Sequence, residues 1–188
     1  TINSLCHLID FYKNSKEDLT KNWLKSRLFK IPNEKITQLT KDFLKPFRSF
    51  VEPDGTVYYE RHPLLKKLFL QIKSEESQIK LQLKNILNSE NFINSLQYHA
   101  FDTINDRYVV PISSDRYSHS LGKIISRSAS GKTLLVEPNE ISQNNDKRIE
   151  LINLLEKKIL EISKKFCEII QKNTSYFATM GQFIFEVD

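Results

Sequence analysis

One short motif in the sequence has the residue types of a nucleotide-binding loop. Ser130-Gly131-Lys132-Thr133 matches the end of a phosphate-binding loop, in which backbone N–H groups and a helix N-terminus hold the phosphates. The full motif also needs a glycine at position 126, where this chain has Ser126. In addition, Leu134-Leu135-Val136 after the motif favours a strand, whereas a phosphate-binding loop continues into a helix. We therefore predict that this segment binds no nucleotide.

The histidines and cysteines do not have the spacing of a metal or catalytic site. Two histidines have an aspartate three residues later, but two ligands do not close a zinc site. Cys6 and Cys167 are far apart in the sequence, which favours small buried side chains in a reducing compartment. Because spacing ties no serine, cysteine or histidine to a partner, we predict no catalytic residue, metal site or cofactor in this chain. The two pairs are His7 with Asp10 and His99 with Asp102.

A group of basic and tyrosine residues between positions 96 and 138 could contact phosphates. Arg107 precedes Tyr108 and Arg116 precedes Tyr117, and such pairs suit phosphate contact combined with ring stacking. Ordinary surface charge is the alternative interpretation. The predicted nucleic-acid-binding residues are Arg107, Tyr108, Arg116, Lys123, Arg127 and Lys132.

Three short segments with strand character carry these residues. Residues 107–112, 121–125 and 133–136 are rich in apolar and β-branched side chains, and polar turns separate them. Alternation along the second strand would place Lys123 and Arg127 on one face. The segments predict a small antiparallel sheet.

Two long helices flank this predicted sheet. Pro63 suits the first residue of a helix that continues to about Asn88, and a second helix is predicted from about Glu140 to Asn173. At 1.5 Å per residue these helices would be roughly 40 and 50 Å long. Each has a narrow apolar seam with heptad spacing, so each needs a partner helix, and the first seam has one polar gap at Glu75–Glu76. The first seam consists of Leu65, Leu68, Ile72, Ile79, Leu83 and Ile86. The second consists of Ile152, Leu155, Ile159, Ile162, Phe166 and Ile169.

The remaining segments predict short helices, one hairpin and a terminal strand. Residues 1–49 have three helical apolar stripes, of which the second includes Trp23 and Phe29 and the third ends near Pro46. Pro53-Asp54-Gly55 favours a hairpin turn, and residues 183–188 predict the start of a strand. The predicted fold is therefore mainly α with a small antiparallel β insertion (α+β): a helical core, two long antiparallel helices and a β sheet at their far end.

Composition limits the possible functions without selecting one. The chain has 188 residues, of which 39% are hydrophobic and 27% charged, with no apolar run of membrane-spanning length and no signal peptide. These features predict a cytoplasmic protein, and the first residue, Thr1, suggests a piece of a longer one. The net charge of +5 permits a polyanionic partner. However, residues 1–95 hold 16 basic and 11 acidic residues, whereas residues 96–138 hold 5 and 4.

An ordered set of motifs resembles the bacterial MutS family. Gly122-Lys123-Ile124 is followed by Ser128-Ala129-Ser130-Gly131-Lys132-Thr133, an apolar triplet, Glu137-Pro138 and then Asn144-Asn145. The chain looks closest to the second, mismatch-independent MutS paralogue, over about residues 50–145 and on to 175. The hairpin at residues 53–57, followed by a long helix, fits the same family.

This resemblance implies a division of the chain into parts of a larger machine. Residues 1–61 would belong to a helical core domain, residues 62–90 and 139–175 would be lever helices, and residues 91–138 would form a β-rich clamp. Residues 176–188 would return toward the core and an ATPase domain outside this chain. In the family, two clamps of a homodimer close around DNA, while ATP with Mg²⁺ drives the motion from that ATPase domain.

The second paralogue is associated with branched DNA, restraint of recombination, an appended nuclease domain and stalled ribosomes. Truncation and an almost charge-balanced clamp are departures of this chain from the family. Three hypotheses stay open: a module that grips the DNA backbone, a structural arm that dimerises or relays motion, and a clamp for ribosomes and their RNA. Charge reversal in the clamp discriminates the first from the second.

Overall fold

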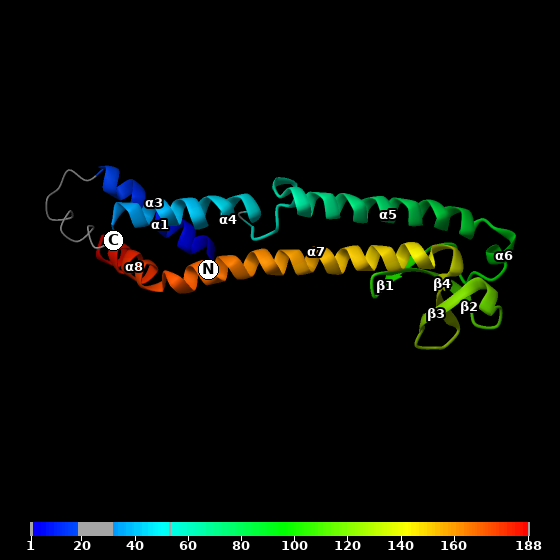
Figure 1. Cartoon of the computed structure of the whole chain (residues 1–188). Helices are drawn as coiled ribbons and strands as arrows, with labels where there is room; N and C mark the ends of the chain where they lie inside the picture. Colours follow the sequence, from blue (N-terminus) through cyan, green and yellow to red (C-terminus); the bar gives the residue numbers. More distant parts are fainter. Residues whose placement is uncertain (1, 19–31, 53, 188) are drawn as a thin grey trace. The chain divides into compact units, whose positions relative to one another are not determined.

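Apolar residues at helical spacing account for most of the structure, and a small β insertion accounts for the rest. The computed structural model describes residues 2–18, 32–52 and 54–187 (Figure 1). Its contacts define two units: a helical unit, residues 1–63 with 158–188, and a sheet unit, residues 64–157. The predicted class, mainly α with a small antiparallel sheet, is confirmed.

The helical unit is built around phenylalanine side chains. The Phe43 ring is fully buried, and its centroid lies 6.1 Å from that of Phe166 and 5.8 Å from that of Phe177, both in edge-to-face contact. Its elements are α1 (Ile2–Asp18), α3 (Asn33–Leu39), the π-helical η1 (Thr40–Leu44), α4 (Lys45–Phe50), the 3₁₀ turn η2 (Tyr59–Arg61), the later part of α7 (Asn139–Lys172) and α8 (Thr174–Val187).

The third predicted helix does not end at Pro46. Instead α3, η1 and α4 form one continuous helix to Phe50, because a π-helical turn precedes the proline. The Lys45 N–H donates to the carbonyl of Thr40, five residues back. This wider turn accommodates the proline, which has no N–H and whose ring would clash in a regular helix. The predicted stripe with Trp23 and Phe29 lies outside the described residues.

Two further predictions in this unit have opposite outcomes. The Asp-Gly hairpin is confirmed, since Val51 pairs with Val57 and Gly55 has a φ of 92°. The strand predicted for residues 183–188 is wrong, because Thr174–Val187 is helical. An apolar run without alternating polar residues has no strand-specific period, and here packing of α8 against α1 supports a helix.

The sheet unit consists of a long helix, a short helix, a four-stranded antiparallel sheet and the start of a third helix. The strand order is β1-β2-β4-β3, so β1 and β3 are the edges. The elements are α5 (Pro63–Leu87), α6 (Glu90–Ile93), β1 (Asp102–Ile104), β2 (Arg107–Ser113), the 3₁₀ turn η3 (His119–Leu121), β3 (Gly122–Arg127), β4 (Thr133–Pro138) and α7 as far as Lys157.

The predicted seam of α5 is the core of this unit. All six of its apolar residues are buried, and its last turns pack against the inner face of the sheet. Asn144 of α7 contacts Gln78 of α5, and Lys147 contacts Glu75, so the two helices run antiparallel. The main core cluster comprises Ile79, Leu83, Ile86, Leu87, Phe92, Tyr108, Val110, Ile112, Leu121, Leu134, Val136 and Ile141.

Tight turns connect the strands in both hairpins. Asn105 and Asp106, between β1 and β2, have φ values of 48° and 62°, as a two-residue primed turn requires. Between β3 and β4, the Ser128 N–H donates to the Thr133 carbonyl, and Gly131 has a φ of 71°. The Ser-Gly-Lys-Thr motif therefore leads into strand β4, as predicted, and not into a helix.

Candidate nucleic-acid interface

An acidic side chain fills the polar gap in the α5 seam. Glu75 is 5% exposed and forms an ion pair with Lys147, while Asn144 Nδ2 donates a hydrogen bond to its carboxylate at 3.1 Å. The hydrogen bond from Lys147 lowers the pKa of Glu75, although burial acts to raise it. The seam thus continues through this position as a polar layer between α5 and α7.

Arg148 joins α5, α7 and the turn between β1 and β2. Its Nε and Nη2 donate to Glu76 Oε1 at 3.2 and 2.9 Å, and its Nη1 donates to the Asp106 carbonyl at 2.7 Å. Its guanidinium lies 5.4 Å from the centre of the Tyr108 ring. Burial acts to raise the pKa of Glu76, but hydrogen bonds from Lys73 and Arg148 outweigh it and lower the pKa.

Acidification is expected to destabilise this polar layer. The folded-state pKa values of Glu75 and Glu76 are lowered. Their contribution to stability is therefore complete above the ordinary glutamate pKa of about 4.3 and is lost as the pH falls through the folded-state values. In urea denaturation followed by circular dichroism, we expect the midpoint to fall between pH 5 and pH 3. The double variant Glu75→Gln, Glu76→Gln should be less stable at pH 7 and depend less on pH over this range.

The exposed residue Glu150 provides the control for this experiment. Glu150→Gln should retain the stability of the parent protein at pH 7 and its steep fall in acid. An equally steep fall in the double variant would contradict the assignment of acid sensitivity to the polar layer.

Asn145 is fully buried, and its side chain forms the hydrogen bonds with β2 that the backbone of a neighbouring strand would otherwise form. Its Oδ1 accepts from the Tyr108 N–H and its Nδ2 donates to the Tyr108 carbonyl, both at 3.1 Å. The same Nδ2 donates to Glu137 Oε1 at 2.7 Å. Arg107 pairs with Glu137 at 2.7 Å and with Asp146 at 2.5 Å, and the hydrogen bond to Asp146 raises the pKa of Arg107. The sheet is therefore fixed to α7 by buried polar contacts.

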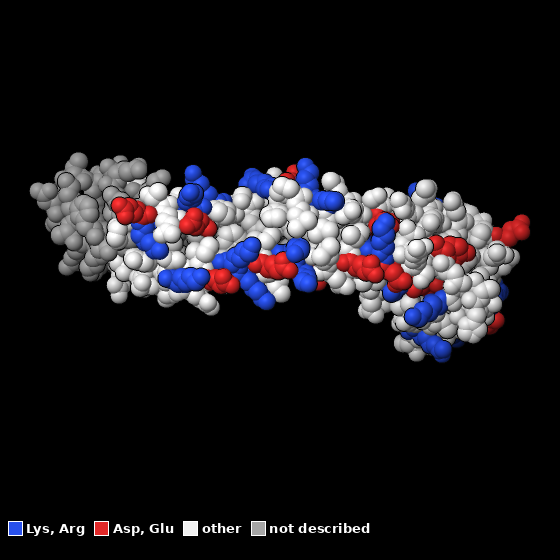
Figure 2. Space-filling model, in the orientation of Figure 1, with Lys and Arg blue, Asp and Glu red and all other residues white. Residues whose placement is uncertain are grey.

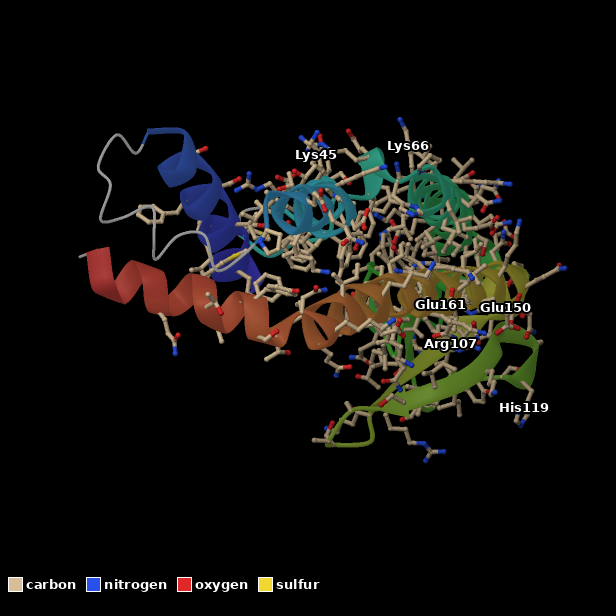
Figure 3. The ribbon with its side chains drawn as sticks, turned by 60° about the vertical axis from the view of Figure 1, so that its left-hand side comes forward. Lys45, Lys66, Arg107, His119, Glu150 and Glu161 are labelled. Carbon is tan, nitrogen blue, oxygen red and sulfur yellow. The ribbon has the colours of Figure 1, made fainter. Side chains whose placement is uncertain are left out.

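Two of the predicted nucleic-acid-binding residues are committed to these contacts. Arg107 Nη1 forms an ion pair with Glu137 and Nη2 forms one with Asp146, and both carboxylates belong to the same unit. Figure 3 shows Arg107 between the sheet and α7. The Tyr108 ring is 6% exposed and belongs to the core. A role in binding nucleic acid stays a prediction for these two residues, and their geometry favours a structural role.

The other four predicted residues are exposed on the sheet and its turns. Arg116 Nη1 donates to the Asn94 carbonyl at 2.7 Å, and its Nε lies 3.9 Å from Asp115. The other three form no ion pair with any residue that the structure describes. Lys and Arg side chains project from the sheet at the lower right of Figure 2, whereas both signs of charge alternate over α7. The four are Arg116 after β2, Lys123 and Arg127 in β3, and Lys132 before β4.

The prediction that Lys123 and Arg127 share one face of β3 is wrong. A register shift between Ile124 and Ser126 inserts a β-bulge. Lys123 consequently lies opposite Glu137 of β4 and Arg127 lies opposite Leu134. Because these partners are three residues apart on one strand, they face opposite sides of the sheet.

A shallow hollow of about 380 Å³ lies beside Lys123. It is bounded by the start of β3, the turn before it and the first residue of α7. His119 lies at the outer side of the sheet and points away from α7 (Figure 3). The lining residues are Tyr117, His119, Gly122, Lys123, Ile124 and Asn139.

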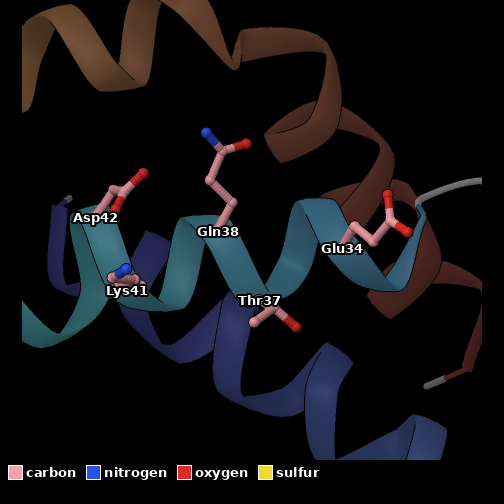
Figure 4. Close-up of a pocket in the computed structure, with 5 residues that line it drawn as sticks. All are labelled: Glu34, Thr37, Gln38, Lys41 and Asp42. Atoms are coloured by element: carbon pink, nitrogen blue, oxygen red, sulfur yellow. The ribbon is translucent and has the colours of Figure 1, made fainter.

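A second hollow, of about 550 Å³, lies in the helical unit. All its lining residues come from one continuous helix, and Glu34, Gln38 and Asp42 project from the same side of it (Figure 4). These side chains do not converge on a point, so we assign no chemistry to this hollow. Its lining residues are Glu34, Thr37, Gln38, Lys41 and Asp42.

The described ranges, 2–18, 32–52 and 54–187, contain neither a cluster of metal-ligating side chains nor a membrane-spanning helix. Within them, no three His, Cys, Asp or Glu side chains are grouped so that they could hold a metal ion. No helix in these ranges is long and apolar enough to cross a membrane.

Sequence reasoning missed the residues that hold the sheet in place. Asn145, Arg148 and Glu137 are polar and buried, yet their partners lie 8 to 72 positions away in the sequence. Asn145 and Glu137 belong to the motifs that resemble the family, but those motifs did not indicate a structural role for either residue. His119 and Asn139 carried no signal, because neither belongs to a recognisable motif.

A small antiparallel sheet inserted between two paired antiparallel helices defines the structural class of the sheet unit. No protein-family model matches the chain. The chain is similar to the Endonuclease MutS2 proteins of three bacteria. It is 33% identical to that of Halalkalibacterium halodurans over 112 residues, which are 59% of this chain and 14% of the relative. It is 34% identical to that of Alkaliphilus metalliredigens over 116 residues, which are 62% of this chain and 14% of the relative.

The third relative, from Lactiplantibacillus plantarum, is 28% identical over 137 residues, which are 73% of this chain and 17% of the relative. The predicted resemblance to the second MutS paralogue is therefore confirmed. The chain spans only about one sixth of the length of the relatives that it matches.

Proposed function

We propose that the sheet unit is the clamp, with the adjoining parts of its levers, of a MutS-family DNA-processing protein, and that it grips the nucleic-acid backbone without reading base sequence. One observation carries this proposal: four basic side chains are exposed on both sides of the sheet and in its turns, and buried polar contacts fix the position of this sheet. Lys and Arg on a rigid support bind phosphates by releasing counterions, which requires no base contact.

The activities of the whole protein belong to the same proposal. The relatives are named endonucleases, and we propose a cytoplasmic parent enzyme whose ATP and Mg²⁺ bind in an ATPase domain outside this chain. Two such subunits would bring two clamps around duplex or branched DNA. A clamp that grips ribosomal RNA would use the same basic residues and is distinguished by the ligand that binds.

Reversing charge on the sheet is expected to abolish salt-sensitive DNA binding. The triple variant Lys123→Glu, Arg127→Glu, Lys132→Glu removes three proposed phosphate contacts. Fluorescence anisotropy with duplex, branched and single-stranded DNA across a salt series measures the effect on the whole chain. We expect affinity at low salt to fall about tenfold or more, and the slope of log K against log salt to decrease in magnitude by about 3.

A second triple variant has the same change of net charge on exposed positions of α5. Lys66→Glu, Lys67→Glu, Lys80→Glu should lose much less affinity and keep most of the salt slope. Equal losses in the two triple variants would show that only net charge matters and would contradict a clamp surface. Absence of binding by the parent chain to all three DNA forms at low salt would favour the structural arm.

A further inference from the structure

We propose that the hollow lined by Tyr117, His119, Lys123 and Asn139 is a phosphate-binding subsite in which His119 and Lys123 are the charged donors. This inference deepens the proposed function and rests on it for the source of the phosphate, which is the nucleic-acid backbone.

The hydrogen bonds of the Tyr117 hydroxyl indicate which nitrogen of the His119 ring carries a proton. The Tyr117 hydroxyl lies 2.8 Å from the Gly122 carbonyl, which can only accept, so the hydroxyl donates its proton there. The same hydroxyl oxygen lies 3.3 Å from His119 Nδ1. Since its proton is already committed, a hydrogen bond between the two groups requires a proton on Nδ1, which the hydroxyl oxygen accepts. This leaves His119 Nε2 as the nitrogen that is free of this contact.

That Nε2 changes its role when the imidazole gains a proton. In the neutral ring with a proton on Nδ1, Nε2 can only accept and would repel a phosphate oxygen. In the imidazolium ion, Nε2–H is a charged donor that suits phosphate. Protonation of the imidazole therefore strengthens phosphate binding by this hollow.

The groups in the hollow are held in place before any ligand arrives. The Tyr117 and His119 rings are in edge-to-face contact with centroids 5.5 Å apart. Asn139 Nδ2 donates to the Ser120 carbonyl at 3.0 Å, which ties the 3₁₀ turn to the start of α7. Gly122 lies so close to β4 that a Cβ atom on it would be 2.0 Å from the Glu137 carbonyl oxygen. The loop therefore need not be ordered at the moment of binding, which favours affinity.

The charges that face His119 favour an anion. Among the residues that the structure describes, the six that line the hollow include no carboxylate, and their titratable members are Tyr117, His119 and Lys123. Lys123 is exposed, and the carboxylate of its cross-strand neighbour Glu137 is buried and paired with Arg107. The Lys123 ammonium and the His119 Nε2 remain as the positive groups toward which a phosphate oxygen would be drawn.

The test uses the whole chain and two phosphate sources. Side-chain NMR signals of the four histidines are followed at pH 6 and pH 8 while inorganic phosphate or a short DNA duplex is added. We expect the His119 signal to shift selectively with both probes at pH 6. In anisotropy, His119→Gln should weaken duplex binding roughly fivefold at pH 6 and little at pH 8. His99→Gln, which removes an exposed histidine outside the hollow, is the matched control and should change neither value.

The outcomes separate this inference from the proposed function. If duplex binding keeps its dependence on the three basic residues while His119 responds to neither probe, the subsite is refuted and the clamp surface stands. If inorganic phosphate shifts His119 but no DNA form binds, the hollow is a phosphate site and the proposed function fails. Loss of binding in His119→Gln that is equal at pH 6 and pH 8 would overturn the protonation argument.

Discussion

Replacing Asn145 by alanine is expected to lower the free energy of unfolding by about 3 kcal/mol, because the change leaves several buried polar groups without partners. The Tyr108 N–H and carbonyl both lose their hydrogen bonds, and Glu137 loses one of its donors. Each unsatisfied buried group costs about 1–3 kcal/mol, and water cannot easily replace a side chain that is fully buried. Urea denaturation followed by circular dichroism measures the loss.

A local measurement distinguishes this explanation from a general loss of stability. Hydrogen exchange at the Tyr108 amide should accelerate more than exchange at Val110, whose neighbour on β4 is unchanged. Gln143→Ala removes an exposed amide two residues earlier on the same helix and should change stability by less than about 0.5 kcal/mol. If Asn145→Ala were equally mild, the carboxamide would not act as the strand neighbour of β2.

Features that depend on neighbouring residues could be predicted from the sequence. The seam of α5 follows from apolar spacing, and all six predicted positions are buried. Even the polar gap marked a real feature, since Glu75 and Glu76 meet partners on α7. Pro63 begins α5, as its fixed φ and missing N–H favour.

Features that depend on distant residues could not be predicted in the same way. Nothing near Asn145 in the sequence indicates that its partner is the backbone of Tyr108, 37 residues earlier. The β-bulge after Ile124 has no local signal either, so alternation gave the wrong relation between Lys123 and Arg127. The helix at residues 174–187 is set by its packing against α1, which an apolar run cannot reveal.

The candidate site was predicted only in its exposed part. Basic residue types indicate where phosphate could bind, but they do not show which cations are already paired. Arg107 illustrates this limit, because it looks like a phosphate ligand in the sequence and is held by Glu137 and Asp146 in the structure. Conversely, His119 gains its proposed role from Tyr117, whose hydroxyl lies beside Nδ1 and donates its own proton to the Gly122 carbonyl.

Replacing Gly122 by alanine is expected to be at least as damaging as the loss of Asn145, with a cost of about 3 kcal/mol or more. The new Cβ would lie 2.0 Å from the Glu137 carbonyl oxygen, so β3 must separate from β4, and the φ of 144° is unfavourable for alanine. Gly131→Ala is the control, since its φ of 71° is also positive but no atom lies within 4 Å of the added Cβ. That variant should cost only about 1–2 kcal/mol, because only the backbone conformation is unfavourable.

Thermal and urea denaturation measure the stability of both variants. Similar costs would mean that backbone conformation, and not the close approach of β3 to β4, explains the glycine. A much larger cost for Gly122→Ala would show that the close approach of β3 to β4 requires a residue without a side chain.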